Sequence, residues 1–151
     1  MEGSINKYSF IYHAIHVLLN NDEDDFNLFS RYLMQKYNSK SYHNLNHIEQ
    51  VFINIDYNLK QLKSMGIDVN KYELKNETPI SIEFKTFLAA IIFHDIFIGY
   101  DDEDEGSDVR VSTQEAIKVC KWFNIEVDEI LLSDILQSTC HPCTNKSNIS
   151  I

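Results

Sequence analysis

Hydrophobic positions recur at helical spacing along nearly the whole chain. Near the N-terminus they follow each other at steps of three and four, which predicts a first helix with one apolar stripe. The stripe consists of Ile5, Tyr8, Tyr12, Ile15 and Leu19. His13 and His16 flank it, and we expect both to be partly exposed packing residues. The first helix is therefore predicted to cover one side of the core.

The remaining pattern predicts five more helices. The acidic residues 22–25 suit a helix N-terminus and lead into a second apolar stripe, formed by Phe26, Phe29, Leu33 and Tyr37. A third helix is expected from near Leu45 to Gly66, followed by a polar connector over residues 67–79. The most apolar segment, Ile80–Ile98, is expected to be a central helix.

The C-terminal third continues the same pattern. Ser107 or Asp108 is expected to cap a fifth helix that runs through Trp122. Its predicted inward residues are Val111, Ala116, Val119 and Phe123. A sixth helix is expected from Val127 to about Cys140. No apolar run shows the period of two that marks a strand, so residues 1–151 are predicted to form a single-domain, all-α bundle of about six helices.

Charge and composition narrow the range of partners. The chain has 151 residues, which fits one domain, and its net charge of −10 would be repelled by a nucleic-acid backbone or an anionic membrane. No apolar run reaches the ~18 residues of a membrane span, and the first residues lack the pattern of a signal peptide. The odd count of three cysteines is typical of a reducing compartment. We therefore expect a cytoplasmic protein.

A polar doublet, His94-Asp95, interrupts the apolar run Ala89–Ile98. Burying both groups is unfavourable unless they are paired, and an imidazole with a carboxylate is a usual ligand mixture for a borderline divalent metal. Taken alone, the doublet is better explained as a core histidine beside a surface aspartate. It is not alone, because His43 and His47 are spaced for one helical face and His141 closes the sixth helix.

The ordered series of motifs resembles the HD superfamily of metal-dependent phosphohydrolases. "YHNLNHIEQV" places His47 in the first metal-ligand position, and "AAIIFHDIFIGYD" contains His94-Asp95 as the signature doublet. "DEDEGSD" is similar to the Asn-Glu-Glu-x-Ser-Ala stretch of one small branch of unknown substrate, with Asp104 and Glu105 in the acidic positions. "ILQSTCH" resembles a later helix of that branch, and the resemblance spans residues 37 to 141.

This resemblance implies hydrolysis of a nucleotide or another small phosphate ester. A divalent ion (Mn, Mg, Co, Ni or Fe) would be bound by His47, His94 and Asp95, with positions left open for water and substrate. Glu105, and after it Asp104, would act as base or proton shuttle. The implied phosphate-binding cations are Lys40, Arg110 and Lys146. Tyr42, His43 and Asn44 would orient the ligands through hydrogen bonds, and packing explains Tyr42 equally well.

Three departures from the family pattern reduce the expected activity. Lys40 and Gln50 stand where relatives carry arginine, which weakens bidentate phosphate binding. The family's fourth ligand is an aspartate on a further helix, whereas only "PCTNKSNISI" follows His141. We therefore expect a domain that lacks the family's C-terminal helices and hydrolyses weakly. His141 is expected to replace the missing ligand, in preference to Asp134.

Two other functions remain open at this point. One is a catalytically degenerate HD-like module that binds a nucleotide or a protein partner through the same cleft. The other is the family's oxygenase branch, which needs two irons and hence more ligands than this sequence offers. An enzyme should respond to added metal, whereas a binding module should keep its partner when His94 is replaced. The oligomeric state is left open by the sequence.

Overall fold

The computed structural model describes residues 5–37, 44–69, 80–96 and 105–138, with the side chains of 105–108 excepted. A short 3-10 helix, η1 (Ile5–Lys7), precedes the six α-helices. These are α1 (Ser9–Leu18), α2 (Glu23–Tyr37), α3 (Leu45–Ser64), α4 (Ile82–Phe93), α5 (Glu105–Trp122) and α6 (Glu129–Gln137). The described ranges contain no strand, so the predicted all-α bundle of about six helices is confirmed.

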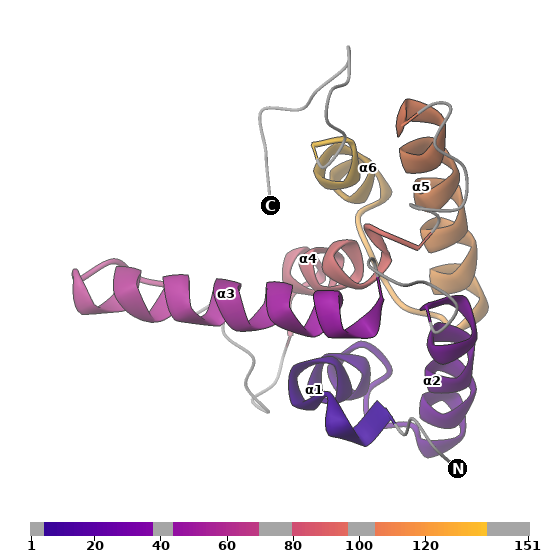
Figure 1. The fold of residues 1–151 in the computed structure, drawn as a ribbon, viewed down its shortest axis with the longest axis horizontal. Helices are drawn as coiled ribbons and strands as arrows, with labels where there is room; N and C mark the ends of the chain where they lie inside the picture. Colours follow the sequence, from indigo (N-terminus) through magenta and orange to yellow (C-terminus); the bar gives the residue numbers. More distant parts are fainter. Residues whose placement is uncertain (1–4, 38–43, 70–79, 97–104, 139–151) are drawn as a thin grey trace.

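Helix α4 lies at the centre of the bundle, between α1 and α3 on one side and α5 and α6 on the other (Figure 1). Nine of its residues are buried, and they point in all directions around the helix axis. A helix that is apolar all round belongs in the interior, because no face of it is suited to water. The prediction that the most apolar segment is central is therefore confirmed.

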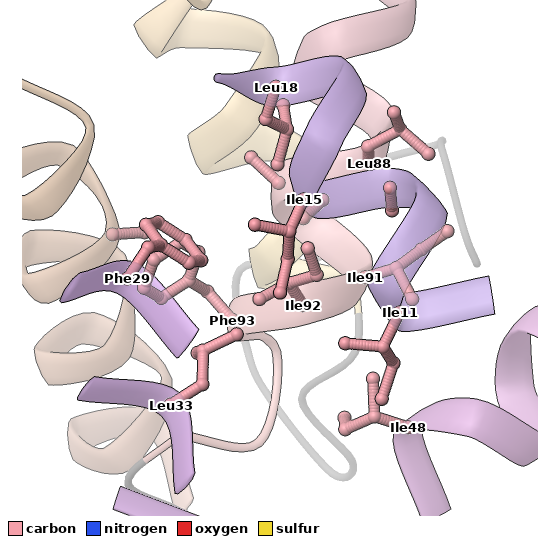
Figure 2. Close-up of a cluster of buried hydrophobic side chains, with 14 of the residues drawn as sticks. Ile11, Ile15, Leu18, Phe29, Leu33, Ile48, Leu88, Ile91, Ile92 and Phe93 are labelled. Carbon is pink, nitrogen blue, oxygen red and sulfur yellow. The ribbon is translucent and has the colours of Figure 1, made fainter. Parts of the chain in front are cut away.

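The core around α4 is formed by side chains from all five other α-helices, and Figure 2 shows those of α1, α2 and α3. Buried residues of α1, α2 and α3 converge on it, and burying each large apolar side chain is worth roughly 1.5–3 kcal/mol. The residues labelled in Figure 2 are Ile11, Ile15, Leu18, Phe29, Leu33, Ile48, Leu88, Ile91, Ile92 and Phe93. Phe29 packs edge-on against both Phe93 and Phe123, at centroid distances of 6.1 and 5.2 Å.

Two predicted apolar faces were partly wrong. Of the predicted stripe, Ile5, Ile15 and Leu19 are buried, whereas Tyr12 is 38% exposed. The buried face of α1 also includes Ile11, Ala14 and Leu18. His13 and His16 are half-buried, as expected.

In α5 the predicted inward residue Val111 is 41% exposed, and the half-buried Phe123 lies just past the end of the helix. The predicted inward residues Ala116 and Val119 are buried, and the buried face also includes Val109 and Thr113. Thr113 can be buried there because its hydroxyl donates to the Val109 carbonyl at 2.8 Å.

Several helix ends also differ from the prediction. Helix α4 ends at Phe93 and not at Ile98, and α5 already begins at Glu105, so Ser107 and Asp108 lie within the helix. Helix α3 does end next to Gly66, which has a φ of +85°. In this left-handed conformation glycine is favoured, and the amide of Gly66 bonds the Lys63 carbonyl at 3.0 Å.

A polar contact joins α2 to α5. The Tyr32 hydroxyl donates to Glu115 Oε2 at 2.5 Å, and Lys118 Nζ lies 3.0 Å from the other carboxylate oxygen. Burial by itself raises the pKa of Glu115, but the hydrogen bonds and positive charge of its partners outweigh this effect and lower the pKa overall. Among the described segments, no helix is long and apolar enough to cross a bilayer.

The fold makes a prediction about Cys120, which is 1% exposed. Burial, assisted by the negative charge of Glu129, raises the pKa of its thiol from 9.0 to about 12. Because the thiolate is the reactive form, we expect alkylation at pH 8 to be slower on the order of a thousandfold than in the unfolded chain. The measurement is iodoacetamide labelling of a Cys140→Ser/Cys143→Ser variant, with and without denaturant.

The same pKa shift has a consequence for stability. Only the unfolded chain releases the thiol proton between about pH 9 and 12, so the free energy of unfolding should fall as the pH rises through this window. A Cys120 that is alkylated in the folded protein at the unfolded rate would contradict the buried position.

Candidate metal centre

His47 lies in the first turn of α3. The helix N-cap and a contact between α3 and α1 fix the position of this turn. Asn44 is the N-cap of this helix, and its side-chain oxygen accepts from the His47 amide at 3.2 Å. Such a cap contributes about 1 kcal/mol and sets the residue at which the helix begins. Two residues further on, Glu49 accepts from the amides of Phe10 and Ile11 at 2.9 and 3.0 Å. The start of α3 is thereby held against the start of α1.

His94 and Asp95 follow directly after the last residue of α4. His94 is the C-cap, still in helical conformation, and Asp95 lies in the turn beyond it. The prediction that the doublet lies within a helix was therefore wrong, because the apolar run continues past the point where the backbone leaves the helix. Asp95 is only 6% exposed, so its carboxylate is nearly removed from water.

One hydrogen bond determines which nitrogen of His94 is free to bind a ligand. Its Nδ1 lies 2.7 Å from the carbonyl oxygen of Ile91, one turn back along α4. A carbonyl oxygen can only accept, so Nδ1 carries the proton and, in the neutral ring, Nε2 presents a lone pair. This Nε2 lies 3.4 Å from Asp95 Oδ2, which also only accepts when ionised. Two acceptors at this distance need a proton or a cation between them.

His47 completes the group from the opposite helix. Its Nε2 lies 3.0 Å from the same oxygen of Asp95, and the two imidazole rings are 5.7 Å apart between centroids. One ligand atom from each of the three residues lies within 4.8 Å of the others. Atoms bound to one ion at about 2.1–2.3 Å are up to about 4.5 Å apart, so the group needs only small adjustments to hold an ion.

The donor set fits a borderline divalent ion. Two imidazoles and one carboxylate suit Zn, Ni, Co, Fe or Mn better than a hard ion such as Mg, which prefers oxygen ligands. Three protein ligands also leave coordination positions for water or substrate. The side chain of His47 is 33% exposed, against 10% for His94 and 9% for Asp95, so the site opens to solvent on the α3 side.

The structure brings together three of the four predicted metal ligands: His47, His94 and Asp95. Asn44 is placed next to them as the cap of α3. Helix α3 begins at Leu45, so the prediction that His43 and His47 share a helical face falls on a residue before the helix. Lys40, Tyr42, His43, Asp104, His141 and Lys146 lie outside the residues that the structure describes.

Of the remaining predicted residues, Glu105 is the first residue of α5 and not part of a loop, and its side chain is outside the description. Arg110 is exposed on α5. Gln50 is exposed and donates to Asn54 on the same helix, at 3.1 Å. Asp134, the less favoured substitute ligand, is exposed on α6, as expected of a solvated helix residue.

The sequence pattern did not indicate that Tyr37 contacts the end of α4 beside the candidate metal centre. It was expected only as a core residue of the second helix, yet its hydroxyl donates to the carbonyl of Ile92 in the last turn of α4 at 2.5 Å. Nothing in the spacing of apolar residues indicates that a buried tyrosine bonds a helix end. The only available signal is that a fully buried hydroxyl needs a partner.

No family model matches the chain, and no curated protein or solved structure is significantly similar to it. The fold and the site define an all-α protein with three side chains able to hold a metal ion.

We expect Ni²⁺ to bind the wild-type protein and His47→Ala to weaken binding about tenfold or more, because one of three protein ligands is lost. Isothermal titration calorimetry measures the dissociation constant. His13→Ala is the matched control, since it removes a half-buried histidine of α1 that is not part of the group. Equal weakening by both substitutions would mean that the ion binds elsewhere.

Proposed function

We propose that this protein is a metal-dependent phosphohydrolase of the HD type, acting on a nucleotide or another small phosphate ester. The observation that carries the proposal is the meeting of His47 with His94 and Asp95. These residues belong to two motifs that are far apart in the sequence and that resemble the HD pattern independently. Their contact across α3 and α4 is what such a pattern requires.

The chemistry of the proposed reaction divides between the ion and the protein. A bound divalent ion would supply Lewis acidity for a phosphoryl oxygen and lower the pKa of a water. The protein's part is to present neutral nitrogen ligands, and the bond from His94 Nδ1 to the Ile91 carbonyl keeps Nε2 available for this. Asp95 contributes a single negative charge, so the occupied site would be net positive and attract an anionic substrate.

Substrate access supports the same function. The more exposed side chain, His47, lies on the solvent side, while Asp95 and His94 form the buried wall. A substrate would approach over the start of α3. Glu105, with Asp104 as the second choice, is proposed as the base. Lys40, Arg110 and Lys146 are proposed as phosphate-binding cations.

We expect phosphate release from nucleotides to be slow, to require added metal, and to be faster with Mn²⁺, Co²⁺ or Ni²⁺ than with Mg²⁺. Asp95→Asn should lower the rate about 100-fold or more, because it removes the only carboxylate among the three ligands. The measurement is a phosphate-release assay over nucleoside mono-, di- and triphosphates with the metals varied.

Asp134→Asn is the control for this assay, because it makes the same chemical change at an exposed position of α6. Turnover that survives both chelator and Asp95→Asn would contradict the proposal. Nucleotide binding without turnover under every metal condition would instead favour the catalytically degenerate binding module.

His141 is proposed as a fourth ligand. If it binds the ion, His141→Ala should weaken Ni²⁺ binding about tenfold, as expected for the loss of one imidazole. Titration of Ni²⁺ and Mn²⁺ into the wild type and the variant measures this effect. Equal affinities would show that His141 is not a ligand and that three protein side chains hold the ion.

A further inference from the structure

The last turn of α4 is held by three hydrogen bonds to three consecutive carbonyls. A helix leaves its final carbonyl groups without partners inside the helix. Here the Ile91 carbonyl accepts from His94 Nδ1 at 2.7 Å, and the Phe93 carbonyl accepts from the Ile96 amide at 3.1 Å. Between them, the Ile92 carbonyl accepts from the Tyr37 hydroxyl at 2.5 Å.

The bond from Tyr37 differs from the other two because it comes from a different helix. His94 and Ile96 belong to the segment that leaves α4, so their bonds move with that segment. Tyr37 is the last residue of α2, and it is fully buried. Its hydroxyl therefore ties the end of α4 to a fixed point in the core.

Loss of this hydroxyl would leave a buried carbonyl without its donor. The Ile92 carbonyl would then be stabilised by a shift toward another donor. The donors at the adjacent carbonyls are His94 Nδ1, which bonds Ile91, and the Ile96 amide, which bonds Phe93. Either exchange would change the ring orientation of His94 or the course of the backbone at Asp95. Ligand atoms must be held within about 0.5 Å of their productive positions, so such a change weakens ion binding.

We propose that Tyr37 is a positioning residue for the metal centre: through the Ile92 carbonyl, its hydroxyl holds the turn that carries His94 and Asp95 in the geometry that binds a divalent ion. The proposal rests on the metal site of the proposed function, but not on hydrolysis. It assigns to Tyr37 an effect on metal affinity in addition to its effect on stability.

The chain offers a matched control on the same helix. Tyr32 also donates a hydrogen bond at 2.5 Å, to Glu115 of α5, and its ring lies 6.5 Å from that of Phe93. Tyr32→Phe thus removes a hydroxyl whose hydrogen bond is as long as that of Tyr37, in the same packed region. The carbonyl groups at the end of α4 keep their donors in this variant. If Tyr37 only stabilises the fold, the two tyrosine-to-phenylalanine variants should bind metal alike.

The experiment compares Ni²⁺ affinity by calorimetry and the melting temperature for wild type, Tyr37→Phe and Tyr32→Phe. We expect both variants to melt at a lower temperature. Only Tyr37→Phe should raise the Kd for Ni²⁺, by about tenfold, the lower end of the range for groups that orient metal ligands. Equal Kd values for the two variants would overturn the proposal.

A measurement on the wild type decides the question if Tyr37→Phe does not fold. Added Zn²⁺, which is diamagnetic, should shift the ¹³Cζ resonance of Tyr37 and leave that of Tyr32 in place. The reason is that the Tyr37 hydroxyl bonds the Ile92 carbonyl, next to the turn that carries His94 and Asp95, whereas the Tyr32 hydroxyl bonds Glu115. An unchanged Tyr37 resonance alongside shifted His94 resonances would overturn the proposal.

The outcomes also separate this proposal from the proposed function. If the wild type binds Ni²⁺ through His47 but releases no phosphate, the hydrolase proposal fails and the role of Tyr37 stands. If the wild type binds no ion at His47, both fail.

Discussion

The burial of α4 on all sides is the constraint on which the rest of the structure depends. A twelve-residue helix with nine buried residues offers no face to water, so other helices must surround it. Helices α1, α3, α5 and α6 each contact it (Figure 1). Buried apolar residues of these helices belong to the same core. The candidate metal centre lies at the C-terminal end of α4, where the chain leaves this buried helix.

Both parts of the metal centre are helix ends, and their dipoles suit the charges they carry. Asp95 faces the first turn of α3, whose partial positive charge favours a carboxylate. His94 caps the C-terminus of α4, whose partial negative charge favours a cation. Each effect is worth about 0.3–1 kcal/mol near the surface and more where water is excluded. The C-terminus of α4 thus favours a divalent ion, whereas the N-terminus of α3 favours the carboxylate of Asp95 and not the ion itself.

The sequence was sufficient to predict the fold class, the central helix and the three side chains that meet in a group able to hold an ion. Periodicity identified α4, because a run of apolar residues that long has few alternatives. The pairing of His47 with His94 and Asp95 followed from motifs in a fixed order and not from any local property. Predictions of which residues of a helix face the core were weaker, and Tyr12 and Val111 are exposed. In α5 a polar residue, Thr113, is buried because its hydroxyl donates to the Val109 carbonyl, which an apolar pattern does not indicate.

The end of α4 could not be predicted for a different physical reason. Apolar residues continue beyond Phe93, so composition gives no signal for the point where the helix stops. At that point the carbonyls of Ile91 and Phe93 accept from the segment that follows α4, and the carbonyl of Ile92 accepts from Tyr37 of α2. A site built on helix ends therefore inherits its geometry from contacts that local sequence patterns do not encode.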